Sequence, residues 1–251
     1  MTERFSGKTA IVTGAANGIG KAIAHRLGKE GAKLALLDIN PAQLQSTMEE
    51  FGEMNIDAMG FPVDVSNEIQ ISDTVTSIEK KWKNIDILVH AAGIVGPTST
   101  KITAYASADF DKVCAVNLKG AFLMTREVLK LMEKTGKGRI LLIASIAGKE
   151  GNPGMVGYSS SKAGLIGLVK GVAKEYATTN ITISGLAPAV IQTPMNLDTS
   201  PEQLKYMLAK IPMQRMGTVE EVAAMSCFIV SDENSFSTGF IFDISGGRAT
   251  Y

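Results

Sequence analysis

Three residues in the second half of the chain carry side chains suited to proton transfer, namely Ser145, Tyr158 and Lys162. Tyr158 and Lys162 are four residues apart, so on a helix they share one face. Ser145 ends the apolar run 139–144, which is typical of a strand. A strand end and a helix face can bring a hydroxyl, a phenol and an ammonium group to one point. A Tyr-x-x-x-Lys pair alone is a weak signal, but it gains specificity from the serine and from the glycine-rich segment 13–20 upstream.

The elements that must position these residues alternate along the chain. Strands are predicted at 9–12, 33–38, 57–61, 85–90, 139–144, 181–186 and 240–243. Helices are predicted at 18–29, 41–53, 68–83, 107–133, 157–178 and 219–230, with a short one at 201–210. Short, continuously apolar strands between helices predict an α/β fold: a single-domain, doubly wound parallel sheet of Rossmann type, with about seven strands and helices on both faces.

Composition restricts the class of protein. The 251 residues are 45% hydrophobic and 20% charged, and they suffice for one large core, so we expect residues 1–251 to form one domain. The formal net charge is zero, which argues against nucleic acid or an anionic membrane as a partner. We expect neither a membrane span nor a signal peptide. Two cysteines and two histidines form no metal-binding spacing, and buried reduced cysteines fit a cytoplasmic protein.

Taken together and in this order, these motifs resemble the short-chain dehydrogenase/reductase superfamily. The resemblance extends from about Lys8 to the C-terminus. It implies an enzyme that interconverts a secondary alcohol and a ketone by hydride transfer with a nicotinamide cofactor. A non-catalytic nucleotide sensor or scaffold that kept the fold is the alternative from another class. Loss of Tyr158 or Lys162 would mark that alternative, and both residues are present.

The cofactor is expected at the glycine-rich turn, because glycines allow close backbone approach and a helix N-terminus favours a pyrophosphate. The turn contributes Gly14, Asn17, Gly18, Ile19 and Gly20. A plain glycine-rich turn is the structural alternative.

Asp38 ends the second predicted strand, where a carboxylate can bind ribose hydroxyls and would repel a 2′-phosphate. Neither Asn17 nor the residues after Asp38, beginning with Ile39, supply the basic group that relatives preferring NADP often carry. The sequence therefore predicts NAD as the cofactor. An incidental acidic surface residue is the alternative for Asp38.

The resemblance implies further cofactor contacts. Asp64 and Val65 would contact the adenine, and Asp86 would brace the adenine pocket. The fourth strand ends in His90, Ala91, Ala92 and Gly93, where relatives usually have Asn-Asn-Ala-Gly. We expect a structural role for His90 rather than a catalytic one.

The segment 188–193 matches the part of the family that holds the nicotinamide carboxamide, through Pro188, Ile191 and Thr193. Alanine at position 189, where relatives usually have glycine, suggests that the backbone there need not adopt a positive φ.

The same resemblance assigns catalytic roles to Asn117, Ser145, Tyr158 and Lys162. Tyr158 would exchange the substrate's hydroxyl proton, and the charge on Lys162 would favour its phenolate form. Lys162 would also hold the nicotinamide ribose, and Ser145 the substrate oxygen. The main-chain carbonyl of Asn117 would hold a water on the proton path to Lys162. No metal is expected.

The substrate is the least determined part. A polar segment at 149–152 favours a polar molecule such as a sugar, a polyol or a keto-sugar acid. Arg248 is a second candidate to bind a carboxylate if the C-terminal tail reaches a pocket, and a solvated tail residue is the alternative for it. A 3-oxoacyl-thioester reductase with Met195, Met207 and Met213 along an acyl channel is the alternative. We expect a substrate lid at about 190–216. Gly164 and Gly167 predict a helix contact between subunits, and the family suggests a homotetramer.

Overall fold

Most strands are short and buried, as a parallel sheet between two helical layers requires, and the two edge strands are only partly buried. The structure is a computed structural model, and it describes residues 3–193, 201–249 and 251. The strands are β1 (Thr9–Thr13), β2 (Lys33–Asp38), β3 (Ala58–Pro62), β4 (Ile87–His90), β5 (Lys137–Ile143), β6 (Asn180–Pro188) and β7 (Ile241–Ile244). The α-helices are α1 (Gly18–Lys29), α2 (Pro41–Glu53), α3 (Glu68–Trp82), α4 (Ser107–Cys114), α5 (Gly120–Thr135), α6 (Ile146–Glu150), α7 (Val156–Glu175), α8 (Pro201–Leu208) and α9 (Val219–Ile229).

The described strands form one seven-stranded sheet in the order β3-β2-β1-β4-β5-β6-β7. Every neighbouring pair is parallel, and β1 lies between β2 and β4. The chain therefore reverses its direction of winding at β1 and β4, and ligands bind at the carboxyl ends of the strands at such a switch point. The predicted fold class is confirmed.

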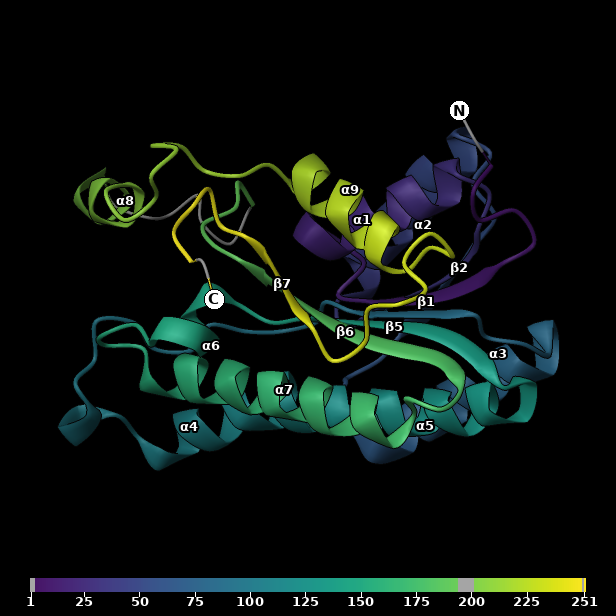
Figure 1. Cartoon of the computed structure of the whole chain (residues 1–251), viewed down its shortest axis with the longest axis horizontal. Helices are drawn as coiled ribbons and strands as arrows, with labels where there is room; N and C mark the ends of the chain where they lie inside the picture. Colours follow the sequence, from purple (N-terminus) through teal and green to yellow (C-terminus); the bar gives the residue numbers. More distant parts are fainter. Residues whose placement is uncertain (1–2, 194–200, 250) are drawn as a thin grey trace.

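The two faces of the sheet carry separate hydrophobic cores. Helices α1, α2 and α9 cover one face, and α3, α4, α5 and α7 lie on the other (Figure 1). Ile23, Leu27 and Phe51 fill the first core, whereas Leu88, Met124 and Leu165 belong to the second. None of the described helices has the length and apolar character that a membrane crossing requires.

One predicted helix is wrong in detail. The range 107–133 is divided into α4 and α5 by a π-helical turn, Ala115–Lys119, with Asn117 buried in its middle. Such π-turns are rare and often occur at functional sites. The short helix α6 and a 3-10 turn, Ile102–Ala104, were not predicted, because neither is long enough to show a periodic pattern.

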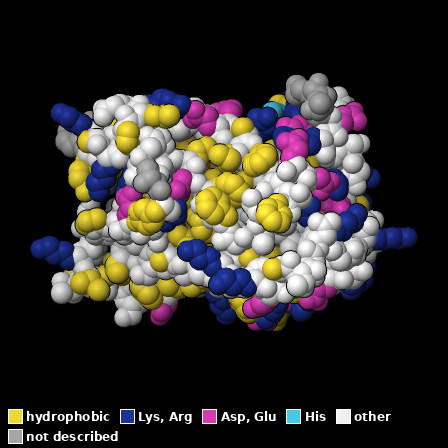
Figure 2. Space-filling view, in the orientation of Figure 1, with side chains coloured by type: hydrophobic (Ala, Val, Ile, Leu, Met, Phe, Trp, Pro, Cys, Tyr) yellow, Lys and Arg dark blue, Asp and Glu magenta, His cyan; other side chains and the backbone are white. Residues whose placement is uncertain are grey.

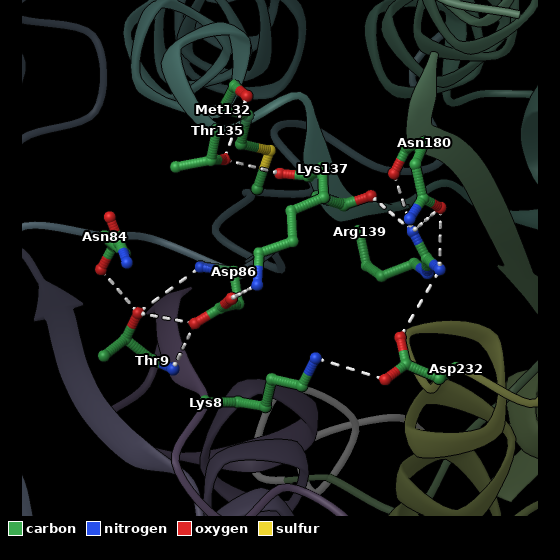
Figure 3. A network of polar contacts seen from close by, with 11 residues as sticks. Lys8, Thr9, Asn84, Asp86, Met132, Thr135, Lys137, Arg139, Asn180 and Asp232 are labelled. Carbon is green, nitrogen blue, oxygen red and sulfur yellow. Dashed lines mark hydrogen bonds and ion pairs between the residues drawn. The ribbon is translucent and has the colours of Figure 1, made fainter.

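A polar network closes the amino-terminal edge of the sheet (Figure 3). Asp86 accepts hydrogen bonds from the Thr9 main-chain N–H at 3.0 Å and from the Thr9 hydroxyl at 3.2 Å. Arg139 donates to the main-chain oxygen of Asn180 at 2.9 Å, and it pairs with Asp232 at 3.4 Å. The expectation that Asp86 braces the adenine pocket is therefore wrong, because Asp86 precedes β4 at the edge opposite the glycine-rich turn.

Candidate active site

The glycine-rich turn is held against the loop that follows β4. Gly14 has a φ of +64°, and a Cβ on it would lie 2.9 Å from main-chain atoms of Ala92. A Cβ on Gly20 would lie 2.0 Å from the carbonyl oxygen of Gly14. Both positions therefore require glycine for packing within the chain. Helix α1 begins after its N-cap, Asn17, and its first turn contains no acidic residue. The main-chain N–H groups of this turn therefore favour an anion from outside the chain.

Thr13 and His90 fix the loop after β4. The Thr13 hydroxyl oxygen accepts from the main-chain N–H groups of Ala91 and Ala92, each at 3.1 Å. Its own proton is then directed to His90 Nδ1, 3.0 Å away, which assigns the ring proton to Nε2. Burial, with a smaller contribution from the charge of Lys162, lowers the pKa of His90 to about 3. A neutral, buried His90 supports the structural role expected for it.

Asp38 stands at the end of β2 beside the glycine-rich turn. One carboxylate oxygen accepts from the Ala16 main-chain N–H at 3.0 Å, and the other accepts from that of Asn40 at 3.0 Å. Ile39, the next residue, is 67% exposed. Asn17 donates to the Gln43 side chain at 3.1 Å on the same surface. The structure thus orients the Asp38 carboxylate through the turn itself, a contact that the sequence does not reveal.

Asp64 and Val65 follow β3 on the same side of the molecule. An Asp64 carboxylate oxygen accepts from the Ser66 main-chain N–H at 2.8 Å and from the Ser66 hydroxyl at 2.7 Å. Val65 is buried, and a Cβ on Gly120 would lie 3.0 Å from it. The glycine at the start of α5 therefore allows close packing against the segment after β3.

Ser145 and Tyr158 meet as their spacing predicts. Ser145 follows β5 and is the N-cap of α6, where its hydroxyl oxygen accepts from the Ala147 main-chain N–H at 3.1 Å. The Ser145 and Tyr158 side chains line one cavity. Burial raises the pKa of Tyr158, and the Ser145 hydroxyl acts in the opposite direction. Ser145 is thus one group that favours the phenolate.

Lys162 lies one helical turn beyond Tyr158, with Nζ 5.9 Å from the centre of the Tyr158 ring. Its ammonium group donates to the main-chain oxygen of Ile143 at 2.7 Å. Burial lowers the pKa of Lys162 to about 8. Ser145 is a group that lowers the pKa of Tyr158 in the structure, and the expected effect of the Lys162 charge on Tyr158 stays a prediction.

Asn117 connects the loop after β4 to α7. Its side-chain oxygen accepts from the Ile94 main-chain N–H at 2.8 Å, and its side-chain nitrogen donates to the Ile94 oxygen at 2.9 Å and to the Ser161 hydroxyl at 3.0 Å. A Cβ on Gly93 would lie 3.1 Å from Asn117 Oδ1 and 3.5 Å from Lys162 Nζ. Asn117 is therefore close to Lys162, and its side chain holds the loop.

The segment after β6 crosses to the glycine-rich turn. Pro188 ends β6, and Ile191 pairs with Gly217 in an isolated parallel bridge. A Cβ on Gly18 would lie 3.7 Å from the Thr193 methyl group. Ala189 is not among the described residues with a positive φ, as its identity suggested.

These elements enclose a cavity of about 480 Å³. Its lining includes Ile19, Ser145, Tyr158, Lys162, Thr193 and Met207. Of the methionines expected along an acyl channel, Met207 lines this cavity, whereas Met213 is 65% exposed and lines a neighbouring cavity. Met195 lies outside the described residues. Among the described residues, no group of three or more His, Cys, Asp or Glu side chains is placed to hold a metal ion.

Comparison with known proteins agrees with this geometry. A family model described as enoyl-(acyl carrier protein) reductase, of the short-chain dehydrogenase/reductase type, matches residues 14–249. The chain belongs to the short-chain dehydrogenase/reductase family. As a member of this family, the protein is an oxidoreductase acting on CH–OH groups.

Several members of the family are similar over nearly their whole length. A 2-dehydro-3-deoxy-L-rhamnonate dehydrogenase (NAD(+)) of a Sphingomonas species is 42% identical over 99% of this chain and 98% of its own. A 3-oxoacyl-[acyl-carrier-protein] reductase of Thermotoga maritima is 38% identical over 97% of this chain and 98% of its own. The crystal structure of an NAD+-bound xylitol dehydrogenase has a TM-score of 0.92 at 32% identity, covering 97% of this chain and 100% of that one.

Proposed function

We propose that the protein is an NAD-dependent dehydrogenase that oxidises a secondary alcohol group of a sugar, polyol or keto-sugar acid to a ketone. The observation that carries the proposal is the cavity in which Ser145, Tyr158 and Lys162 meet at the switch point of the sheet. A sugar-acid dehydrogenase named for NAD and an NAD+-bound polyol dehydrogenase are among its relatives.

The residues present fit a dinucleotide with an unphosphorylated ribose. The main-chain N–H groups at the start of α1, where Asn17 makes no side-chain capping bond, suit the pyrophosphate. The oriented Asp38 carboxylate suits two ribose hydroxyls. The adenosine half would also meet Ile39, Asp64 and Val65. Tyr158 and Lys162 would meet the ribose of the nicotinamide half. The other residues expected to contact the cofactor would also meet this half, namely Ala91, Ala92, Gly93, Pro188, Ile191 and Thr193.

Bound NAD supplies the hydride acceptor, and the chain supplies positioning and proton transfer. The Ser145 hydroxyl oxygen already accepts from Ala147, so its own proton is available to the substrate oxygen or to Tyr158. Tyr158, in the phenolate form that Ser145 favours, accepts the hydroxyl proton of the alcohol and becomes the neutral phenol. Lys162, which has a pKa of about 8, is able to exchange a proton near neutral pH. Asn117 keeps the loop beside Lys162 in place.

A 3-oxoacyl-thioester reductase is the alternative, and the relative from Thermotoga maritima supports it. Asp38 weighs against it if the thioester enzymes use NADPH, as the family resemblance suggests. The position of Met213 outside the cavity also weighs against an acyl channel.

The proposal also covers the oligomeric state of the protein, its substrate lid and its cellular location. We propose a homotetramer in the cytoplasm, with residues 190–216, including α8, as a lid on a single domain. Hydrophobic side chains gather near the centre of one face, over α9 and β7 (Figure 2). Phe236 and Phe240, in the segment between α9 and β7, are exposed. A Cβ on Gly167 of α7 would meet no atom of its own chain within 4 Å, which leaves room for a second subunit.

Gly164 has a different role from the one that its spacing suggested. A Cβ there would lie 2.8 Å from Leu118, so this glycine allows packing within the chain. The surface for a second subunit on α7 is therefore argued from Gly167 rather than from Gly164.

The test compares two reactions under one set of conditions. Oxidation of a panel of aldonic acids, keto-deoxy sugar acids and polyols is followed with NAD and with NADP. Reduction of acetoacetyl-CoA is followed with NADH. We expect the highest kcat/KM for a sugar acid or polyol with NAD. Thioester turnover orders of magnitude faster than any of these would overturn the proposal, as would equal use of NADP.

A further inference from the structure

The C-terminal segment brings an arginine to the active-site cavity. Arg248 lies four residues beyond the end of β7, and its side chain is 6% exposed. It lines the same cavity as Ser145 and Tyr158, on the side formed by Asn152 and Pro153. Arg248 is therefore not a solvated tail residue.

Contacts to the segment after β5 fix the guanidinium group. Arg248 Nε and Nη2 donate to one Glu150 carboxylate oxygen at 2.9 and 2.7 Å, and Nη2 also donates to Asn152 Oδ1 at 3.2 Å. The described contacts occupy neither of the two N–H groups of Nη1. A planar guanidinium held in this way keeps donors available for a ligand in the cavity.

The charges around the cavity point to the sign of that ligand. The described lining contains three cationic side chains, those of Lys162, Lys210 and Arg248, and no carboxylate. Glu150 lies behind Arg248 and does not line the cavity. A small, partly enclosed cavity with this lining attracts anions, because the positive potential there is only partly screened by water.

We infer that Arg248, together with the side-chain amide of Asn152, binds a carboxylate of the substrate, and that the substrate is a sugar acid rather than a neutral polyol. The inference rests on the proposed function, because it concerns the substrate of the same site. The Nη1 N–H groups and the Asn152 amide donate to the carboxylate oxygens. Ser145 and Tyr158 hold the hydroxyl that is oxidised, so the carboxylate fixes which carbon reacts.

The experiment compares each substrate acid with its neutral amide. Wild-type enzyme should oxidise the acid with a kcat/KM at least tenfold above that of the amide. Arg248→Met keeps the aliphatic stem but removes the charge. It should raise KM for the acid about 10- to 100-fold, as expected for loss of a charge-assisted hydrogen-bonded pair, with a smaller change in kcat and a change within about threefold for the amide. Arg248→Lys keeps the charge but not the planar group, so its KM for the acid should lie between those of the wild type and Arg248→Met.

Two further measurements distinguish a direct contact with the carboxylate from a structural role and from a general effect of charge. Lys210→Met removes another cation of the cavity and should change KM for the acid by less than about threefold. The rise in melting temperature that the acid causes in protein saturated with NADH should disappear in Arg248→Met. Equal losses of kcat/KM for acid and amide in Arg248→Met would assign Arg248 a purely structural role and overturn the inference. Equal rises in KM for the acid in Arg248→Met and Lys210→Met would also overturn it, because a general positive potential would then explain the binding.

The outcome for the wild type separates the inference from the proposed function. Wild-type enzyme that uses the amide as well as the acid would refute carboxylate recognition and leave the proposed function standing. The proposed function itself fails if neither is oxidised with NAD and the thioester is reduced instead.

Discussion

Replacing Lys162 by methionine tests how strongly the fold opposes a charge at the centre of the site. Burial lowers the pKa of Lys162 from its ordinary value of 10.5 to about 8. Each pKa unit corresponds to about 1.4 kcal/mol, so the buried ammonium costs the folded state about 3 kcal/mol. The hydrogen bond to the Ile143 oxygen offsets part of this cost in the wild type.

The sign of the pH dependence follows from proton binding. Below about pH 8, Lys162 is protonated in both the folded and the unfolded state, and the cost is constant. Between about pH 8 and 10.5 the unfolded state binds the proton that the folded state has lost, so stability rises with pH. The free energy of unfolding of the wild type, minus that of Lys162→Met, should therefore rise by about 3 kcal/mol across this window.

Urea unfolding at a fixed protein concentration, from pH 7 to pH 10.5, measures this difference directly. Lys170→Met removes an exposed lysine from the same helix and serves as the matched control. A difference between the wild type and Lys162→Met that stays flat over the whole range, or that falls as pH rises, would refute the reasoning.

Three further changes test other parts of the account. Asp38→Asn keeps an acceptor for the Ala16 N–H but loses the charge, so the preference for NAD over NADP in kcat/KM should fall at least tenfold; an unchanged ratio would exclude Asp38 as its source. Gly20→Ala should lower the free energy of unfolding in urea by more than about 3 kcal/mol. Gly52→Ala, whose Cβ meets open space, should raise this free energy by roughly 0.5–1 kcal/mol, and equal effects of the two changes would contradict the packing argument. Gly167→Leu should lower the mass measured by light scattering, and an unchanged tetramer would move the interface elsewhere.

Much of the fold was predictable because its signals are local. The apolar runs of β2 and β5, and the glycine-rich turn before α1, each lie within a short window of sequence. The proximity of Ser145 and Tyr158 followed from one strand end and one helix face, since parallel strands bring their carboxyl ends to the same edge.

The remaining features depend on partners that are distant in sequence. Asp86 pairs with Thr9, 77 positions away, and Arg248 pairs with Glu150, 98 positions away. The π-turn around Asn117 lies within one continuous helical pattern, so no period in the sequence marks it. The spacing of Gly164 suggests a subunit interface, but in the fold the Leu118 side chain packs against this glycine. Such roles become visible only once the chain has folded.

The central claim is that Tyr158 transfers the substrate's proton in an NAD-dependent oxidation. Steady-state oxidation of the best sugar acid or polyol by Tyr158→Phe, with NADH binding measured on the same protein, tests it most directly. The account predicts a fall in kcat of about 10²- to 10⁴-fold, with the NADH dissociation constant within about threefold of wild type, because phenylalanine removes only the proton-transfer group. Activity within a few-fold of wild type, with NADH binding intact, would show that another residue is the base and contradict the account.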